Sequence, residues 1–287
     1  MNQFRIKSFC KVNLFLRVLG KLNNGYHNIK SLITFCDFYD TISIRKIKGT
    51  KDIISFSGKF KKGINKKSNT ITKVLFLLRK RKYFIKQAFR INIQKNIPHG
   101  SGLGGGSSNA ASLLNFFNTE MHLKLNKHAL KKIASKIGFD VPISLEKKNT
   151  LLTGKRDQIL RMNKKFKLNI LIVYPNIVCS TKKIYKKNRK FTLPKPNSIS
   201  KIENTDQLID ILRNEKNDLE KVVIKTYPEI RKIIDFIKAQ NGCYFSRITG
   251  SGSACIGIFS NNETAIYGKK LIRSKFPKFW CVISKTI

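Results

Sequence analysis

The sequence has few acidic residues and no long apolar run. Its 287 residues include 58 lysines and arginines but only 16 aspartates and glutamates, which gives a formal net charge of +42. No stretch reaches the roughly 18 apolar residues that span a bilayer. Basic residues near the N-terminus also interrupt any signal-peptide core. The sequence therefore predicts a protein that does not enter a membrane, and we expect it in the cytoplasm.

The cysteines lack the spacing of a metal site or a disulfide framework. They include no C-x-x-C pair, and no histidine stands at metal-ligand spacing from them. The six residues are Cys10, Cys36, Cys179, Cys243, Cys255 and Cys281. We expect buried thiols in a reducing compartment.

The excess of basic residues extends over nearly the whole chain. A nucleic-acid-binding protein concentrates such residues on one face or tail and interleaves them with aromatic residues. The 41% of hydrophobic residues and the 20 phenylalanines are enough for a buried core, so the charge does not indicate disorder. We predict a folded protein with solvated lysine-rich faces and no specific nucleic-acid partner, although its charge favours non-specific adhesion to polyanions.

Strand-like and helix-like patterns follow each other without strict alternation. Apolar residues alternate, as in strands, or form short apolar runs in the segments 4–18, 31–47, 89–95 and 168–174. Helical spacing covers the segments 71–81, 110–121, 126–137, 206–215 and 218–238, the last interrupted at Pro228. This mixture predicts an α+β fold.

The length favours two domains, because one domain typically takes roughly 100–200 residues. We expect an N-terminal α+β domain of residues 1–160 and a C-terminal domain of residues 161–287. In the second, a strand at 168–174, a strand-turn-strand pattern at 247–259, and a helix from Glu263 before a final strand predict a ferredoxin-like arrangement.

A glycine-rich segment is the strongest local signal. Residues 98–111 read PHGSGLGGGSSNAA, with five glycines in seven positions. Glycine lets the backbone bend sharply and approach a ligand closely. Ser107 and Ser108 offer hydroxyls for the N-cap of a helix that begins there, and such a helix start binds phosphate. A flexible linker is disfavoured, since a strand-like segment enters and an amphipathic helix leaves.

The spacing separates this segment from two common phosphate loops. No lysine stands where the Walker pattern G-x-x-x-x-G-K-[ST] requires one. Gly100, Gly102 and Gly105 fit G-x-G-x-x-G, and Glu120 follows downstream, which keeps a dinucleotide-binding fold open. That fold needs its acid at the tip of a second parallel strand, whereas residues 113–121 have helical spacing, so it is disfavoured.

Four motifs in the expected order resemble the GHMP kinases. They are the glycine-rich loop, an N-terminal signature at 11–27, Gly-x-Asp-Val-Pro at 138–142 and a third glycine motif at 249–253. The resemblance implies an ATP-dependent phosphotransferase with an alcohol acceptor, using Mg²⁺ with ATP. The expected acceptor is the 2-hydroxyl of 4-diphosphocytidyl-2-C-methyl-D-erythritol, in non-mevalonate isoprenoid precursor synthesis. Mevalonate or homoserine as acceptor, and a basic RNA-binding protein that retains the fold, are the alternatives.

The resemblance also implies roles for individual residues. Lys11 would stabilise the transferred phosphoryl group, and Asp140 would accept the proton of the acceptor hydroxyl. The expected ATP-binding residues are Pro98, His99, Gly100, Ser101, Gly102, Leu103, Gly104, Gly105, Gly106, Ser107 and Ser108. The expected acceptor-binding residues are Asn13, Tyr26, His27, Thr181 and Tyr185, with the two tyrosines stacked on cytosine and the histidine at its edge. We expect a monomer or homodimer that acts on small molecules.

Overall fold

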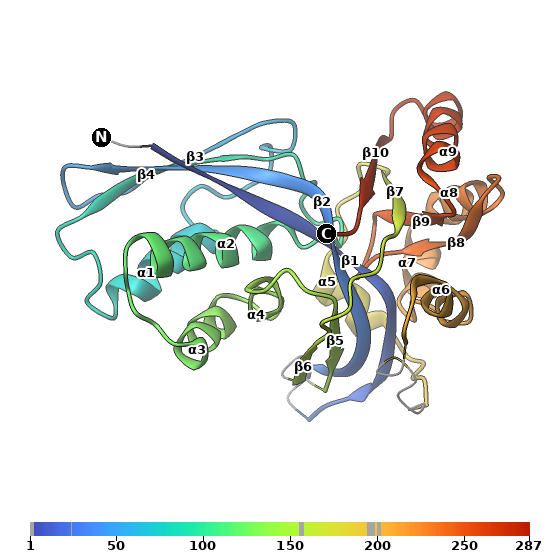
Figure 1. Cartoon of the computed structure of the whole chain (residues 1–287), viewed down its shortest axis with the longest axis horizontal. Helices are drawn as coiled ribbons and strands as arrows, with labels where there is room; N and C mark the ends of the chain where they lie inside the picture. Colours follow the sequence, from blue (N-terminus) through green and yellow to red (C-terminus); the bar gives the residue numbers. More distant parts are fainter. Residues whose placement is uncertain (1–2, 24, 155–157, 194–198, 200–201) are drawn as a thin grey trace. The chain divides into compact units, whose positions relative to one another are not determined.

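The structure is a computed structural model that describes residues 3–23, 25–154, 158–193, 199 and 202–287. It mixes helices and strands (Figure 1), so the α+β prediction is confirmed. Contacts group the chain into two compact units. Unit 1 comprises Met1–Cys10, Phe38–His99 and Gly104–Glu146, and unit 2 comprises Lys11–Asp37, Gly100–Leu103 and Lys147–Ile287. The division into domains 1–160 and 161–287 stays a prediction.

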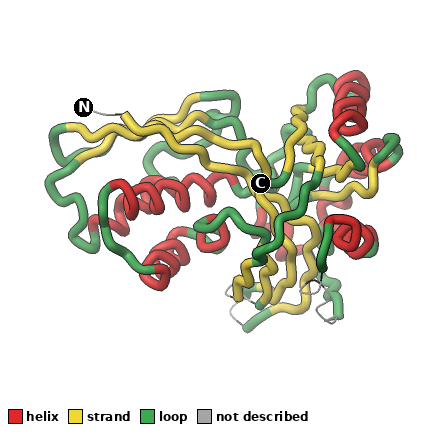
Figure 2. The backbone as a smooth tube through the Cα atoms, viewed as in Figure 1, coloured by secondary structure: helices red, strands yellow, loops and turns green. Residues whose placement is uncertain are grey.

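Unit 1 combines a sheet with four helices, coloured by element type in Figure 2. Its strands are the first part of β1 (Gln3–Lys21), the second part of β2 (His27–Ile47), β3 (Ile53–Ser57) and β4 (Ala88–Gln94). β4 pairs antiparallel with β2 and parallel with β3. The helices are α1 (Thr70–Arg79), α2 (Gly105–Glu120), α3 (Lys127–Ile137) and α4 (Val141–Ser144).

One apolar cluster joins the sheet of unit 1 to its helices. In β4, Phe89, Ile91 and Ile93 alternate with Arg90 and Asn92, and only the apolar set is fully buried. The helices add Val74, Leu78, Leu113, Phe117 and Ile133 to the same cluster. Each such side chain contributes roughly 1.5–3 kcal/mol when fully buried. This core fixes β4 and α2, the two elements that flank the glycine-rich segment.

Unit 2 contains a four-stranded antiparallel sheet in the order β10-β7-β9-β8. Its strands are β7 (Asn169–Tyr174), β8 (Cys243–Ile248), β9 (Cys255–Phe259) and β10 (Trp280–Lys285). Between β7 and β8 lie α5 (Thr181–Lys187), α6 (Thr205–Arg213), α7 (Glu220–Thr226) and α8 (Glu229–Lys238), and α9 (Asn262–Lys275) precedes β10. The strand order confirms the ferredoxin-like prediction.

The remaining strands of unit 2 extend from the two long strands. The first part of β2 pairs antiparallel with β5 (Thr150–Thr153), and β5 pairs antiparallel with β6 (Gln158–Arg161). The second part of β1 also belongs to this unit. β1 and β2 thus carry residues of the predicted acceptor site on regular backbone rather than on loops.

Two features differ from the sequence-based expectation. Helix α2 begins at Gly105, with Gly104 as its N-cap, so the prediction that it begins at Ser107 and Ser108 is wrong. Gly104 has φ 69°, a left-handed conformation that glycine adopts at little cost, and this lets the helix start earlier. The short strands β3, β5 and β6 were not predicted. Among the described residues, no helix is long and apolar enough to cross a membrane.

Candidate active site

The glycine-rich loop ends directly in helix α2. Gly100, Gly102 and Gly104 have φ values of 64°, 84° and 69°, which only glycine adopts readily. No side chain caps α2 at Gly104, so the first backbone N–H groups of the helix are not covered by a cap of its own. A helix start of this kind attracts anions through its N–H groups and its dipole. The backbone conformation therefore suits a phosphate loop.

In unit 2, three backbone hydrogen bonds hold the first half of the loop. The Lys11 N–H donates to the Leu103 carbonyl (3.0 Å), and the Cys179 N–H donates to the Gly100 carbonyl (2.9 Å). The Ala254 N–H donates to the Ser101 carbonyl (3.0 Å). The loop is thus tied to β1, to the segment before α5 and to the loop between β8 and β9.

The third glycine motif, residues 249–253, packs directly against the glycine-rich loop. A Cβ atom at Gly102 would overlap the Thr249 carbonyl oxygen, so only glycine fits here. Asn217 in turn donates through Nδ2 to the Ile248 carbonyl (3.1 Å) and the Gly250 carbonyl (2.9 Å). The motif therefore supports the loop in addition to turning the chain from β8 to β9.

In unit 1, side chains link the second half of the loop to Asp140. The Thr70 hydroxyl donates to the Gly106 carbonyl (2.9 Å). The Ser108 hydroxyl donates to the Ser144 hydroxyl (3.4 Å), which donates to the Asp140 carbonyl (3.1 Å). Asp140 is half-buried at the N-cap of α4. Ser108 and Asp140, both predicted from the sequence, are thus joined through Ser144.

A buried ion pair lies beside the start of α2. The Lys95 ammonium binds the carboxylate of Asp40, whose other oxygen accepts from the backbone N–H groups of Asn96 (2.7 Å) and Ile97 (2.8 Å). A Cβ atom at Gly105 would lie 3.3 Å from Lys95 Nζ. Burial lowers the pKa of Lys95, while the charge of Asp40 opposes that shift. The pair fixes the chain that enters the glycine-rich segment.

Lys11 and Asn13, predicted separately, are hydrogen-bonded in unit 2. Lys11 Nζ donates to Asn13 Oδ1 (2.6 Å), and Asn13 Nδ2 donates to the Ser31 hydroxyl (2.8 Å). That hydroxyl donates onward to the Phe15 carbonyl (2.6 Å). The Asn13 N–H also donates to the Thr249 hydroxyl (2.8 Å). The buried ammonium of Lys11 is therefore oriented by a network that reaches β2 and the third glycine motif.

Three of the predicted acceptor residues also have defined neighbours in unit 2. The rings of His27 and Tyr185 lie 5.1 Å apart between centroids, at an interplanar angle of 43°. The hydroxyls of Thr181 and Ser251 lie 2.9 Å apart, which places α5 against the third glycine motif. Tyr26 is half exposed at 50%, as expected for a ring that meets a ligand from one side.

Cys179, whose backbone N–H binds the glycine-rich loop, carries a buried thiol. Burial raises the pKa of Cys179 to about 11, and a hydrogen bond with Ser253 opposes the shift only partly. The six cysteines form no disulfide, and four of them are buried. A thiol with a raised pKa is a poor nucleophile at neutral pH, so Cys179 contributes its backbone N–H rather than thiolate chemistry.

Comparison with known proteins agrees with this geometry. The family models for the GHMP kinases N terminal domain and the GHMP kinases C terminal match residues 69–148 and 199–269. The 4-diphosphocytidyl-2-C-methyl-D-erythritol kinase of Pelagibacter ubique is 39% identical over 289 residues, with 100% of each chain covered. The chain belongs to the GHMP kinases. The kinase of the same name from Caldicellulosiruptor bescii is 35% identical and covers 91% of both chains.

A solved structure shares the fold of this GHMP kinase. It is that of a 4-(cytidine 5'-diphospho)-2C-methyl-D-erythritol kinase, with a TM-score of 0.79 and 22% identity, covering 99% of this chain and 100% of that chain. The family models and the relative from Pelagibacter ubique confirm the resemblance inferred from the four sequence motifs. Nucleotide use follows from the family, whereas the roles assigned to single residues stay predictions.

Sequence reasoning missed the polar partners that hold the predicted residues of this GHMP kinase. Ser144 and Ser31 connect predicted residues through hydroxyls that no motif marks. The pair of Lys95 and Asp40 joins residues 55 positions apart. An acidic residue within an apolar strand, in a chain with only 16 acids, was the one available signal for Asp40.

Proposed function

We propose that this GHMP kinase transfers the terminal phosphoryl group of ATP to the 2-hydroxyl of 4-diphosphocytidyl-2-C-methyl-D-erythritol, in isoprenoid precursor synthesis. The observation that carries the proposal is the relative from Pelagibacter ubique, which bears that enzyme's name and matches along its whole length. The neighbouring rings of His27 and Tyr185 support an acceptor that contains a nucleobase. Mevalonate and homoserine contain no aromatic ring, so these two side chains would have no base to contact in either acceptor.

In the proposed reaction, the acceptor oxygen forms a bond to the γ-phosphorus, and the bond from that phosphorus to ADP breaks. The carboxylate of Asp140 accepts the proton of the acceptor hydroxyl. The ammonium of Lys11, held by Asn13, stabilises the negative charge that gathers on the transferred group. Asn13 and Thr181 hold the diphosphate and methylerythritol part, while Tyr26 and Tyr185 contact the base.

The glycine-rich loop holds the ATP phosphates through backbone N–H groups at the start of α2. Mg²⁺ bound with ATP would supply positive charge that offsets the charge of the phosphates. Among the described residues, no group of three or more histidine, cysteine, aspartate or glutamate side chains forms a metal cluster. The Ser108 hydroxyl would be the side chain of the loop that binds this ion.

The cellular setting belongs to the same proposal. We place the enzyme in the cytoplasm, as a monomer or homodimer with small-molecule substrates and no specific nucleic-acid partner. An N-terminal domain of residues 1–160 would bind ATP, and a C-terminal domain of residues 161–287 would complete the acceptor site. Cysteines that form no disulfide are consistent with a reducing compartment.

A coupled assay for ADP release tests the proposal. Purified protein with Mg-ATP is offered 4-diphosphocytidyl-2-C-methyl-D-erythritol, mevalonate or homoserine, and the product is identified by phosphorus NMR. We expect ADP release and a 2-phosphate with the first acceptor alone. Turnover of another alcohol would reassign the acceptor. No acceptor-dependent turnover, together with salt-sensitive polyanion binding, would favour the RNA-binding alternative.

Two substitutions test the roles of single residues. Asp140→Ala should abolish turnover while nucleotide affinity, measured by calorimetry, stays unchanged. Lys11→Met should lower kcat by about 10²–10³-fold, because a fixed donor to developing charge contributes on that order. Lys46→Met, at an exposed lysine of β2, is the matched control and should behave as wild type. Turnover near the wild-type rate in Asp140→Ala would exclude that residue as the base.

A further inference from the structure

A further aromatic ring lies beside the predicted acceptor residues in unit 2. The ring of Phe191 is centred 6.4 Å from that of His27, at an interplanar angle of 40°. Tyr185 meets the same histidine at 5.1 Å. Phe191 is 46% exposed, although it is one of the most apolar side chains. Phe191 is not among the acceptor-binding residues that the family resemblance implies.

The chain between Tyr185 and Phe191 has a defined turn. Asn188 ends helix α5, and its N–H donates to the Tyr185 carbonyl (3.1 Å). Its side chain is buried, and Nδ2 donates to the Lys190 carbonyl (2.7 Å). Asn188 therefore holds the backbone on both sides of the turn, and this determines the position of Phe191 relative to Tyr185.

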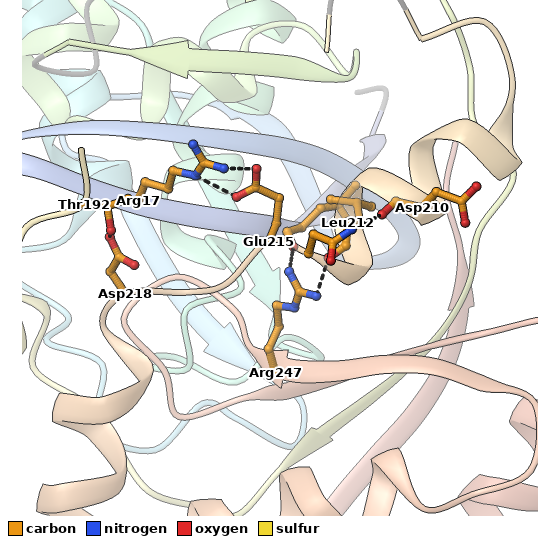
Figure 3. Close-up of polar contacts among 9 residues, drawn as sticks. Arg17, Thr192, Asp210, Leu212, Glu215, Asp218 and Arg247 are labelled. Carbon is orange, nitrogen blue, oxygen red and sulfur yellow. Dashed lines mark hydrogen bonds and ion pairs between the residues drawn. The ribbon is translucent and has the colours of Figure 1, made fainter. Parts of the chain in front are cut away.

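The residue after Phe191 is fastened to strand β1. The Thr192 N–H donates to the Val18 carbonyl (2.9 Å). The Thr192 hydroxyl donates to Asp218 Oδ2 (2.6 Å), and Figure 3 shows these two residues side by side. The same carboxylate oxygen accepts the Val18 N–H (2.8 Å). One carboxylate of Asp218 thus joins the segment that carries Phe191 to the backbone of β1.

Asp218 is itself held in place along β1. Its N–H donates to the Leu16 carbonyl (2.8 Å), and the Leu16 N–H donates to the Lys216 carbonyl (3.1 Å). Three residues before Asp218, Glu215 pairs with Arg17 through two hydrogen bonds, drawn in Figure 3. Both side chains of this ion pair are about nine-tenths buried. The support of Phe191 is therefore rigid, while its ring stays half open to solvent.

A fixed but exposed aromatic ring is suited to binding. Hydrophobic burial would favour turning the ring inward, and the hydrogen bonds of Asn188 and Thr192 hold its backbone at the surface instead. Because the segment is ordered before a ligand arrives, little conformational entropy is lost on binding. The aromatic nucleobase is the part of the proposed acceptor that can meet such a ring, edge to face.

We propose that Phe191 is a further specificity-determining residue, which contacts the edge of the nucleobase beside His27, and that Asp218 positions it through Thr192. The inference rests on the proposed function, which supplies the cytidine diphosphate acceptor. It adds a ring to the tyrosines and the histidine already assigned, and it adds two positioning residues that do not touch the substrate.

Steady-state kinetics of Phe191→Leu test the contact, because leucine keeps apolar bulk but has no ring. We expect the KM for 4-diphosphocytidyl-2-C-methyl-D-erythritol to rise about 2- to 13-fold, the range for losing one edge-to-face aromatic contact. The kcat and the KM for ATP should stay unchanged, and Phe191→Tyr should restore the acceptor KM. Leu193→Ala, in the same segment and 82% exposed, is the control and should match wild type. An acceptor KM within twofold of wild type in Phe191→Leu would overturn the proposal.

A double-mutant cycle tests the positioning role. Thr192→Val removes the hydroxyl that donates to Asp218 and keeps the side-chain shape. Alone it should raise the acceptor KM several-fold, and combined with Phe191→Leu it should add little, because both changes act on one ring. Fully additive effects would contradict positioning. Wild-type turnover with an unaffected Phe191→Leu variant refutes only this inference, whereas absence of wild-type turnover refutes the proposed function and this inference with it.

Discussion

Replacing Gly102 by alanine is expected to destabilise the protein strongly. Gly102 has φ 84°, and holding an L-residue in a left-handed conformation costs roughly 1–2 kcal/mol. The added Cβ would overlap the Thr249 carbonyl oxygen and lie 3.1 Å from the carbonyl carbon and 3.3 Å from the Gly252 carbonyl oxygen. All three are backbone atoms, so no side chain can turn away, and overpacking of this kind adds about 1–3 kcal/mol. The free energy of unfolding should fall by about 2–5 kcal/mol.

Urea unfolding followed by circular dichroism and by fluorescence measures this loss. Trp280, the single tryptophan, lies on β10 and reports on unit 2, to which Gly102 belongs. Gly106→Ala is the matched control from the same loop. Its Cβ would meet nothing closer than Thr70 at 3.8 Å, so its stability should stay level or rise by up to about 1 kcal/mol. A Gly102→Ala protein within about 0.5 kcal/mol of wild type would refute the steric argument, since that is the scatter of neutral surface changes.

Two further predictions concern buried ionisable groups. Lys95→Met leaves the carboxylate of Asp40 buried without its partner and should lower the free energy of unfolding by about 3–5 kcal/mol, with partial recovery when Asp40→Asn is added. Denaturant melts of both variants check this, and an unaffected single variant would contradict it. Burial raises the pKa of Cys243 to about 12, so this thiol stays protonated in the folded state while the unfolded thiol ionises. Above about pH 9 its contribution to stability should fall with rising pH, by up to about 1.4 kcal/mol per unit, and Cys243→Ala should show a correspondingly shallower fall. Equal slopes in both proteins would count against the raised pKa.

The sequence predicted those parts of the fold that depend on local patterns. The alternation in β4 and the helical spacing of α2 and α3 follow from side-chain periodicity, and Pro228 ended one helix and began the next as expected. The start of α2 was misplaced because serine hydroxyls are common caps, whereas a left-handed glycine at position 104 leaves no sequence signature distinct from its neighbours. The short strand β5 is stabilised by pairing with β2, and β6 by pairing with β5, and no local pattern encodes either pairing.

The candidate site was predictable where a motif concentrates its residues. The glycine-rich loop could be predicted because five glycines in seven positions are typical of a loop whose backbone approaches a phosphate closely. The partners that orient Lys11 and Asp140 were not predictable, because Ser31 and Ser144 are ordinary serines until the fold brings them within hydrogen-bonding distance. The sequence motifs predict the candidate catalytic residues, whereas the residues that hydrogen-bond to them can be identified only from the tertiary structure.

The hydrogen bond from Asn13 to Thr249 bears on how the chain folds during translation. Its two ends are separated by 236 residues, so a ribosome adding about 5–20 residues per second delivers the second roughly 10–50 seconds after the first. Until then, the second part of β1 is synthesised without the third glycine motif, which contacts it in the folded protein. Chaperones bind exposed apolar strands of this kind. Conditions that slow translation should therefore increase aggregation of the nascent chain, while protein that has already folded should stay soluble.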